Sequence, residues 1–352
     1  MIDTTLILLC HNRPNAFLRA VNYYENYVDK IKILILISGR INKKNYQLKK
    51  KKNFKVIFLN KNLHEKVNFG LKKIKTKYSL MCGIDDFILV DSIITCKNFL
   101  AKNHDYISCH GRYYLHKSFS EIKNTRNLVK DISAESCSID QKEIINRAVA
   151  YLTNFNPAST NFYAVYKTTI LKSIFKTLCS HLKRFKKDPT ITLEMMFCLL
   201  SHMLGKTKHL NNLYSTKEKH ISIPNVDLSL FEEKILLEDY VKFTINKFKF
   251  LKKISEEEEE KIKFFLLEKF YKVQIHHNNK IKKIIINLLK KIKGYQLIKE
   301  FYLNISEHKK NDLKYINTKN KKEVNKIIQT IYKFPDVENE ANLSRKLYVR
   351  KK

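Results

Sequence analysis

The chain has 352 residues and a formal charge of +34, and 44% of its residues are apolar. This apolar share is enough for a packed core and argues against wholesale disorder, while only six glycines and five prolines argue against collagen-like or turn-rich all-β architectures. So positive a chain attracts nucleic acid, anionic membranes or phosphorylated substrates, although a composition rich in Lys, Asn and Ile is also typical of an AT-biased genome.

The first 85 residues alternate between apolar runs and helical patterns. Buried strands are predicted at 4–10, 31–37, 54–59 and 78–82, and helices at 15–27 and 63–74. This order is typical of a doubly wound α/β sheet, whose ligands bind beyond the carboxyl ends of the strands. Polar clusters follow several of these strands, so we expect a functional site at that edge.

Further helices and strands are predicted after residue 85, and the composition changes near residue 227. We expect helices at 92–102, from 168 and at 189–204, strands at 106–110 and 161–165, and a polar loop region at 115–156. From 227 onward glycine and proline nearly vanish, and a helix N-terminus is predicted at 255–260. We therefore predict an α/β domain at 1–226, a mostly helical region at 227–335 and a frayed basic tail at 336–352.

The cysteines and the N-terminal residues indicate the cellular compartment in which the protein is expected. Seven cysteines are scattered without a CxxC pair, as is typical of reduced core cysteines in a cytosolic protein. The N-terminus lacks the basic region of a signal peptide, and no apolar run reaches the roughly 20 residues needed to span a bilayer. We expect a cytoplasmic protein, soluble or peripheral at the inner membrane.

Two adjacent acids, Asp85 and Asp86, follow the apolar run at 78–82 directly. A strand end would deliver both carboxylates to the ligand-binding edge, where they can hold a divalent cation that bridges a diphosphate. The alternative is that Asp85 begins a turn and N-caps the segment that follows it. The pair alone favours this alternative.

The order TLILLCHNRP, ILILISGR and KVNFGLKKIKTKYSLMCGIDDF resembles the nucleotide-binding half of GT-A glycosyltransferases, closest to the family-2-like enzymes of bacterial surface-polysaccharide loci. The matching features are an asparagine on a helix, a Thr-x-Tyr segment and an acidic motif, here Asn68, Thr76 with Tyr78, and Asp85–Asp86. The resemblance covers 3–110 well and 155–220 weakly. It implies a GT-A (Rossmann-like) nucleotide-sugar-binding domain in front of the helical region.

The resemblance also implies roles for particular residues. Mn²⁺ or Mg²⁺ would be held by Asp86 and Asp85, although Ile84 stands where a fuller motif carries another acid, and metal dependence is therefore open. Ser38 stands where many members carry an acid that contacts the base or ribose. Because this acid is missing, the identity of the nucleotide is left open. The implied nucleotide-sugar-binding residues are His11, Asn12, Arg13, Ser38, Asn68, Lys72, Asp85 and Lys206.

Inverting transfer requires a general base, and the resemblance implies an acid on a helix in the second half of the domain. Glu194 fits best, because its apolar neighbours would raise its pKa if it were partly buried. Asp188 is the reserve candidate. The alternative for Glu194 is a solvent-facing residue in the first turns of a helix.

The expected function is transfer of a sugar from a nucleoside-diphosphate donor to a bacterial surface glycan, of capsule or lipooligosaccharide type, with a glycan or lipid-linked glycan as acceptor. The basic amphipathic pattern at 280–294 would either contact an anionic membrane or pack on neighbouring helices. Two other functions stay open: a basic nucleic-acid-binding protein, disfavoured because no RNA-binding signature occurs, and a degenerate transferase fold that acts as a binding subunit.

Overall fold

The computed structural model describes residues 2–39, 53–117, 130–131, 137–153, 160–182, 190–219, 230–251 and 254–274. Asp188, the helix predicted at 280–294 and the tail at 336–352 lie outside these ranges, and the predictions made for them stay predictions.

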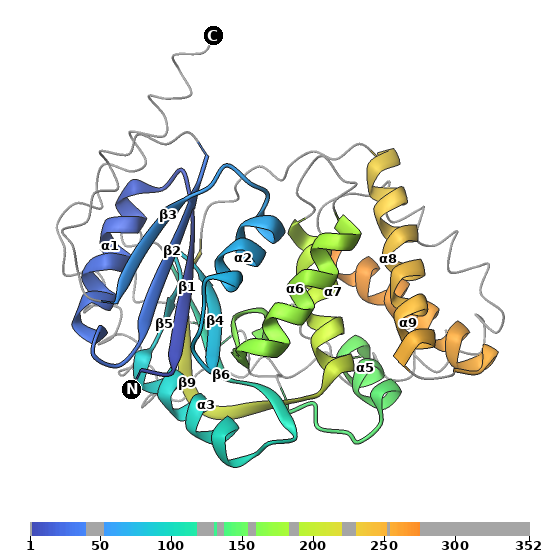
Figure 1. Ribbon diagram of the computed structural model, residues 1–352. Helices are drawn as coiled ribbons and strands as arrows, with labels where there is room; N and C mark the ends of the chain where they lie inside the picture. Colours follow the sequence, from blue (N-terminus) through green and yellow to red (C-terminus); the bar gives the residue numbers. More distant parts are fainter. Residues whose placement is uncertain are drawn as a thin grey trace, which may run out of the picture.

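Four parallel strands form the first half of the sheet in the order β3-β2-β1-β4 (Figure 1). They are β1 (Thr4–His11), β2 (Lys32–Ser38), β3 (Phe54–Phe58) and β4 (Tyr78–Gly83). The continuous apolar runs of β1, β2 and β4 are explained by burial on both faces of a parallel sheet, whereas β3 lies at the sheet edge and is not buried as predicted. These strands, and the helices α1 (Pro14–Tyr24) and α2 (Leu63–Lys72), confirm the predicted order.

The second half of the sheet is mixed. The short strand β8 (Val165–Lys167) runs antiparallel between β4 and β6 (Tyr106–Lys117), and β6 pairs in parallel with β9 (Lys206–Lys219). The strands β5 (Phe87–Ile88) and β7 (Lys130–Asp131) pair with β9 and β6. Within the described ranges these nine strands form one sheet.

Two predictions in this half were wrong, and one strand was missed. The strand expected at 161–165 is a 3-10 turn, η3 (Thr160–Tyr163), followed by β8. The region at 115–156, expected as polar loop, includes the end of β6, β7 and the helix α5 (Ile144–Thr153). The long strand β9 was not predicted, because its sequence KTKHLNNLYSTKEK lacks an apolar run.

Helices cover both faces of the sheet. Helix α1 and helix α3 (Val90–Lys102) share a buried cluster with every second residue of β1, such as Leu6 and Leu8. The alternate residue Ile7 joins the opposite cluster with α2, α5, α6 (Thr168–Leu182) and α7 (Thr190–Leu204). Because strand side chains alternate between faces, the same strands serve two cores.

The helices α8 (Leu230–Leu251) and α9 (Glu256–Gln274) confirm the expected helical character for the part of 227–335 that the structure describes, which ends at 274. Ser255 and Glu258 form a reciprocal capping box, since each backbone N–H is bound by the other side chain at 2.9 and 3.2 Å. Buried Tyr240 and Phe248 belong to the same cluster as α5, α6 and α7. The domain boundary at 226 stays a prediction, while the core itself continues across it.

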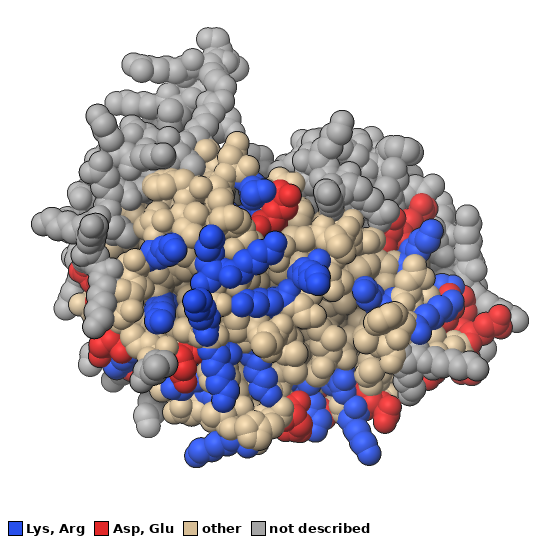
Figure 2. Space-filling model, in the orientation of Figure 1, with Lys and Arg blue, Asp and Glu red and all other residues tan. Residues whose placement is uncertain are grey.

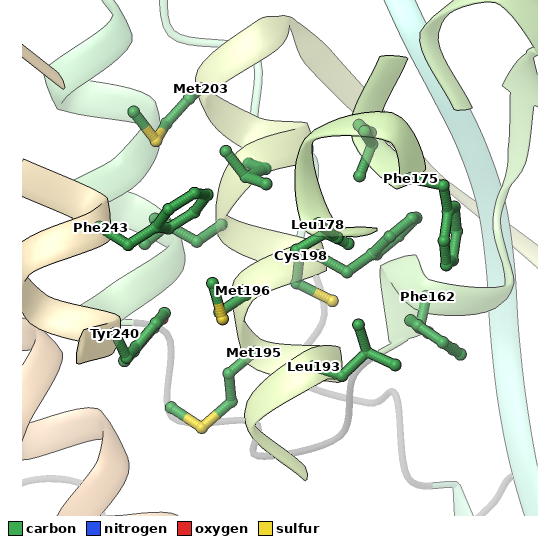
Figure 3. Close-up of a cluster of buried hydrophobic side chains, with 14 of the residues drawn as sticks. Phe162, Phe175, Leu178, Leu193, Met195, Met196, Cys198, Met203, Tyr240 and Phe243 are labelled. Carbon is green, nitrogen blue, oxygen red and sulfur yellow. The ribbon is translucent and has the colours of Figure 1, made fainter. Parts of the chain in front are cut away.

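Phe197 holds α7 in place. Its ring lies 4.9 Å from that of Phe162 and 5.5 Å from those of Tyr166 and Phe175, in the cluster shown in Figure 3. Edge-on and tilted aromatic contacts of this kind are favourable beyond simple burial. They fix the helix that carries Glu194 against η3 and β8.

Lysine and arginine side chains are spread over the face shown in Figure 2, with few acids between them. Among the helices of the described ranges, none combines the length and the apolarity that crossing a bilayer requires.

A buried histidine predicts acid sensitivity. Burial, together with the neighbouring His209, lowers the pKa of His110 to about 3. In the unfolded chain the same imidazole takes up a proton near pH 6.5, so the folded state loses stability as pH falls below that value. From pH 7.5 to pH 5 this one group would cost roughly 2 kcal/mol. His110→Phe should therefore flatten the pH dependence of the free energy of unfolding, measured by urea denaturation.

The exposed His104 provides the control. His104→Gln should retain the wild-type pH dependence. If His110→Phe also retains it, the imidazole of His110 does not resist protonation in the folded state.

Candidate functional site at the carboxyl edge of the sheet

The ends of three neighbouring strands form the floor of the candidate site. In the sheet register His11 of β1 lies beside Ser38 of β2, and Gly83 of β4 lies beside Leu9 of β1. The chain segments that follow these strands therefore meet at one edge, as expected for a doubly wound sheet.

Arg13 and Asp85 come together across this edge. Nη1 of Arg13 donates to Oδ2 of Asp85 at 2.5 Å, and the two side chains are 27% and 20% exposed. Asp85 lies in the turn between β4 and β5, and α3 begins only at Val90. The turn expected in the alternative is therefore present, but the N-cap of α3 is Leu89 without a side-chain cap, and the carboxylate of Asp85 binds Arg13 in the loop after β1.

Gly83 creates the space in which the acid pair meets Tyr163. A Cβ at Gly83 would lie 2.8 Å from Oδ1 of Asp85, 3.1 Å from the hydroxyl of Tyr163 and 3.5 Å from Oδ2 of Asp86. Three oxygens thus converge on a point that a larger side chain would occupy. Tyr163 was missed at the sequence level, because no motif marks the turn that carries it.

Lys217 adds a cation to this group. Its Nζ lies 4.4 Å from the ring centroid of Tyr163 and 5.7 Å from that of Tyr113, within the range of cation–π attraction. Burial and the charge of Asp86 raise the pKa of Cys82, whereas Lys217 lowers it. The ammonium of Lys217 and the carboxylate of Asp86 therefore both influence the thiol of Cys82.

Glu194 acts electrostatically on the same tyrosine as the acid pair. Its half-buried side chain projects from α7. Burial raises the pKa of Tyr163 well above its usual value, with further contributions from Asp86 and Glu194. The pKa of Tyr163 therefore responds both to the predicted metal ligands and to the predicted base.

The loop after β1 closes over the end of β2. Gly39 has a φ of 99°, and a Cβ there would overlap the side chain of Asn12. Nδ1 of His11 lies 3.1 Å from Oγ of Ser38, which also receives a bond from Nζ of Lys66 at 2.8 Å. Lys66 was also missed, although a lysine on the apolar face of a predicted helix is a signal that could have identified it.

The structure places three other predicted residues elsewhere. Lys206 binds Asp105 at 2.7 Å, at the amino end of β6 and β9 and thus at the opposite edge of the sheet. Asn68 and Lys72 lie near Cys179 of α6, where both oppose the effect of burial on the thiol pKa. None of the three is brought to Arg13 and Asp85, so we leave them out of the candidate site.

Comparison with known proteins identifies the architecture. No protein-family model and no curated protein sequence matches the chain. The crystal structure of S. aureus TarS 1–349 is similar, with a TM-score of 0.52 and 13% identity over 84% of this chain and 81% of that chain. Its complex with UDP-GlcNAc gives a TM-score of 0.53 at 13% identity, with the same coverage.

The chain has a GT-A glycosyltransferase fold. The GT-A fold predicted from sequence is thereby confirmed. At this level of identity the likeness concerns the fold alone. The roles of side chains must come from the geometry of this chain.

Proposed function

We propose that the protein is a nucleotide-sugar glycosyltransferase of the family-2-like type. The observation that carries this proposal is the convergence of Asp85, Asp86 and Tyr163 over Gly83, with Arg13 bound to Asp85, at the ligand edge of a GT-A fold. The TarS complex with UDP-GlcNAc supports the nucleotide-sugar part, because it has the same fold.

The proposed donor site is built for a diphosphate. Arg13 presents a guanidinium suited to phosphate oxygens, and Lys217 presents an ammonium held on an aromatic face. In the described part of the chain no group of three His, Cys, Asp or Glu side chains forms a complete metal cage. Two carboxylates with substrate phosphates are nevertheless a common ligand set for Mg²⁺, so Asp85 and Asp86 fit such a cation. When bound, Mg²⁺ or Mn²⁺ would supply charge stabilisation to the diphosphate.

Glu194 is the proposed base. In an inverting transfer it would take the proton of the acceptor hydroxyl while that oxygen forms its bond to the anomeric carbon. The bond from this carbon to the diphosphate oxygen breaks, and the nucleoside diphosphate leaves with the electron pair. Arg13 and Lys217 would stabilise the charge that develops on the leaving oxygen.

The acceptor we propose is a bacterial surface glycan, free or lipid-linked, modified from a cytoplasmic location. The basic pattern predicted at 280–294 would bring the enzyme to an anionic membrane surface, and this segment lies outside the described residues. Acceptor, location and membrane contact are proposals from sequence.

A thermal titration tests the proposed function. We expect UDP, GDP or CMP to raise the melting temperature of the purified protein, and a nucleoside diphosphate to act more strongly with Mn²⁺ than without it, since ligands that bind the folded state stabilise it. UDP-GlcNAc is the first donor to assay for hydrolysis and transfer. Tight, salt-sensitive RNA binding with no response to any nucleotide would contradict the proposal and favour a nucleic-acid-binding protein.

A further inference from the structure

Six lysines gather around the amino end of β4, in the turn between α2 and β4, at the end of β8 and on α6. We call this set the lysine face: Lys73, Lys75, Lys77, Lys167, Lys172 and Lys176. The three lysines of the turn are exposed, and so is Lys176. Figure 2 shows lysine and arginine side chains gathered over α2 and α6, which lie side by side in Figure 1.

Backbone groups hold the two segments of the lysine face together. The amide N–H of Thr168, the first residue of α6, donates to the carbonyl of Lys77 at 2.9 Å. Nζ of Lys172 donates to the carbonyl of Ile74 at 2.8 Å, and an ammonium keeps two further donors after one such bond. The start of α6 is therefore fixed against the turn, and the lysines of both segments are neighbours.

Neighbouring acids do not balance the charge of the lysine face. Within the described ranges, none of the six lysines forms an ion pair with a carboxylate. Burial lowers the pKa of Lys167; Asp105 opposes this effect, and the like charge of Lys77 adds to it. Asp105 is itself bound to Lys206 at 2.7 Å. Like charges held so close repel one another, so their arrangement points to a partner of opposite charge.

The aromatic rings beside these lysines favour a membrane over nucleic acid as that partner. Nζ of Lys73 lies 5.1 Å from the ring centroid of Phe69, and Nζ of Lys77 lies 5.5 Å from that of Tyr78. Tyr78 is buried, and the half-buried ring of Phe69 has the ammonium of Lys73 against it, so neither ring is open for stacking with bases. Lysines whose stems lie along apolar groups while the ammonium reaches outward suit the headgroup region of a bilayer.

We propose that the lysine face docks the enzyme on a bilayer containing anionic phospholipids, whose headgroup phosphates the lysines bind. The inference goes beyond the proposed function and requires no nucleotide. Asp85 and Asp86 follow the carboxyl end of β4, whereas Lys77 precedes its amino end, so a bilayer on the lysine face leaves the proposed donor site uncovered. An enzyme held in this way would meet a lipid-linked acceptor by diffusion along the surface.

Sedimentation of the full chain with lipid vesicles tests the proposal. We expect binding to vesicles of phosphatidylcholine mixed with phosphatidylglycerol, weakening as salt is added, and no binding to phosphatidylcholine alone. Lys73→Gln, Lys75→Gln and Lys77→Gln combined should lower the vesicle partition coefficient by roughly 10²-fold, because each cation near an anionic surface contributes about fivefold. Failure of the wild-type protein to bind the anionic vesicles would overturn the proposal.

A variant with the same loss of charge provides the matched control. Lys142→Gln, Lys242→Gln and Lys261→Gln combined remove exposed lysines just before α5, on α8 and on α9. The net charge falls equally, while the lysine face is intact, so vesicle binding should stay within a few-fold of wild type. Equal weakening in the two variants would show attraction by net charge alone and contradict the proposal.

Two other sources of binding are distinguished in the same assay. Lys282→Gln, Lys283→Gln and Lys290→Gln combined change the basic pattern predicted at 280–294. If only this variant loses vesicle binding, the contact lies in that segment and the lysine face is not the docking surface. If the lysine-face variant loses RNA binding while its vesicle binding is unchanged, the face belongs to a nucleic-acid site and the proposal is wrong.

Nucleotide titration separates this inference from the proposed function. The lysine-face variant should keep the melting temperature of the wild type and its response to UDP, because its changes lie at the opposite end of β4 from the acid pair. If neither protein responds to any nucleotide, the proposed function fails, while a selective loss of vesicle binding still supports the docking surface.

Discussion

Replacing Glu194 by glutamine is expected to slow sugar transfer by about 10²–10⁴-fold, the usual contribution of a general base. Glutamine keeps the size and hydrogen-bonding shape of the side chain but cannot take a proton at neutral pH. Because Glu194 lies on α7 and not in the turn after β4 that would hold the diphosphate, nucleotide affinity should stay within a few-fold of wild type. Single-turnover transfer and nucleotide titration measure the two effects separately.

Two variants make the result interpretable. Glu257→Gln changes an exposed glutamate of α9 and should leave transfer unaffected. Asp188→Asn tests the reserve base, which lies outside the described residues. Full transfer by Glu194→Gln together with loss of transfer in Asp188→Asn would move the base to Asp188. Nucleotide binding without hydrolysis of any sugar donor, unaffected by Glu194→Gln, would instead indicate a degenerate transferase fold.

The first half of the fold is predictable because its signals are local. Each of the strands β1, β2 and β4 is an apolar run buried on both faces, and each run ends where polar residues begin. The meeting of Arg13 with the acid pair follows from the same pattern, since parallel strands deliver their ends to one edge. Neither inference needs contacts between distant elements.

The second half depends on partners that the sequence does not show. Strand β9 contains Ser215 and Thr216, both fully buried. Because these buried residues are polar, the sequence of β9 shows no apolar run that would indicate an interior strand. Strand β8 has only three residues and exists because β4 and β6 pair with it from opposite sides. Tyr163 lies at the end of the turn η3, just before β8, and no local sequence pattern marks it as a site residue.

Lys66 and Asn68 of α2 face different parts of the molecule, although the resemblance points only to Asn68. They are two positions apart, which places them on roughly opposite sides of α2 at 3.6 residues per turn. Lys66 turns towards the strand ends and Asn68 towards Cys179 of α6. The apolar spacing of Val67 and Leu71 already marked the buried face, and Lys66 borders it.

Replacing Asp86 by asparagine is expected to reduce transfer by about 10²-fold or more and to abolish the extra nucleotide stabilisation that Mn²⁺ supplies. A cation on a leaving diphosphate is worth several kcal/mol, and each 1.4 kcal/mol is about tenfold in rate. Asp86 is only 9% exposed and its Oδ2 faces the space over Gly83, so asparagine retains the shape while losing the charge. Transfer rates and melting temperatures, each with and without Mn²⁺, measure the effect.

The surrounding residues provide the controls for this prediction. Asp91→Asn changes an aspartate that is 82% exposed and pairs with Lys30, and it should leave both readouts at wild-type values. Gly83→Ala perturbs the same space without removing a charge, because the new Cβ would press on Asp85 and Tyr163, and it should weaken the Mn²⁺ response in parallel with Asp86→Asn. If Asp86→Asn transfers sugar at the wild-type rate and Mn²⁺ has no effect on either protein, the diphosphate charge is carried by Arg13 and Lys217 alone. The carboxylate of Asp85 would then serve to hold Arg13 in place for the phosphates rather than to bind a cation.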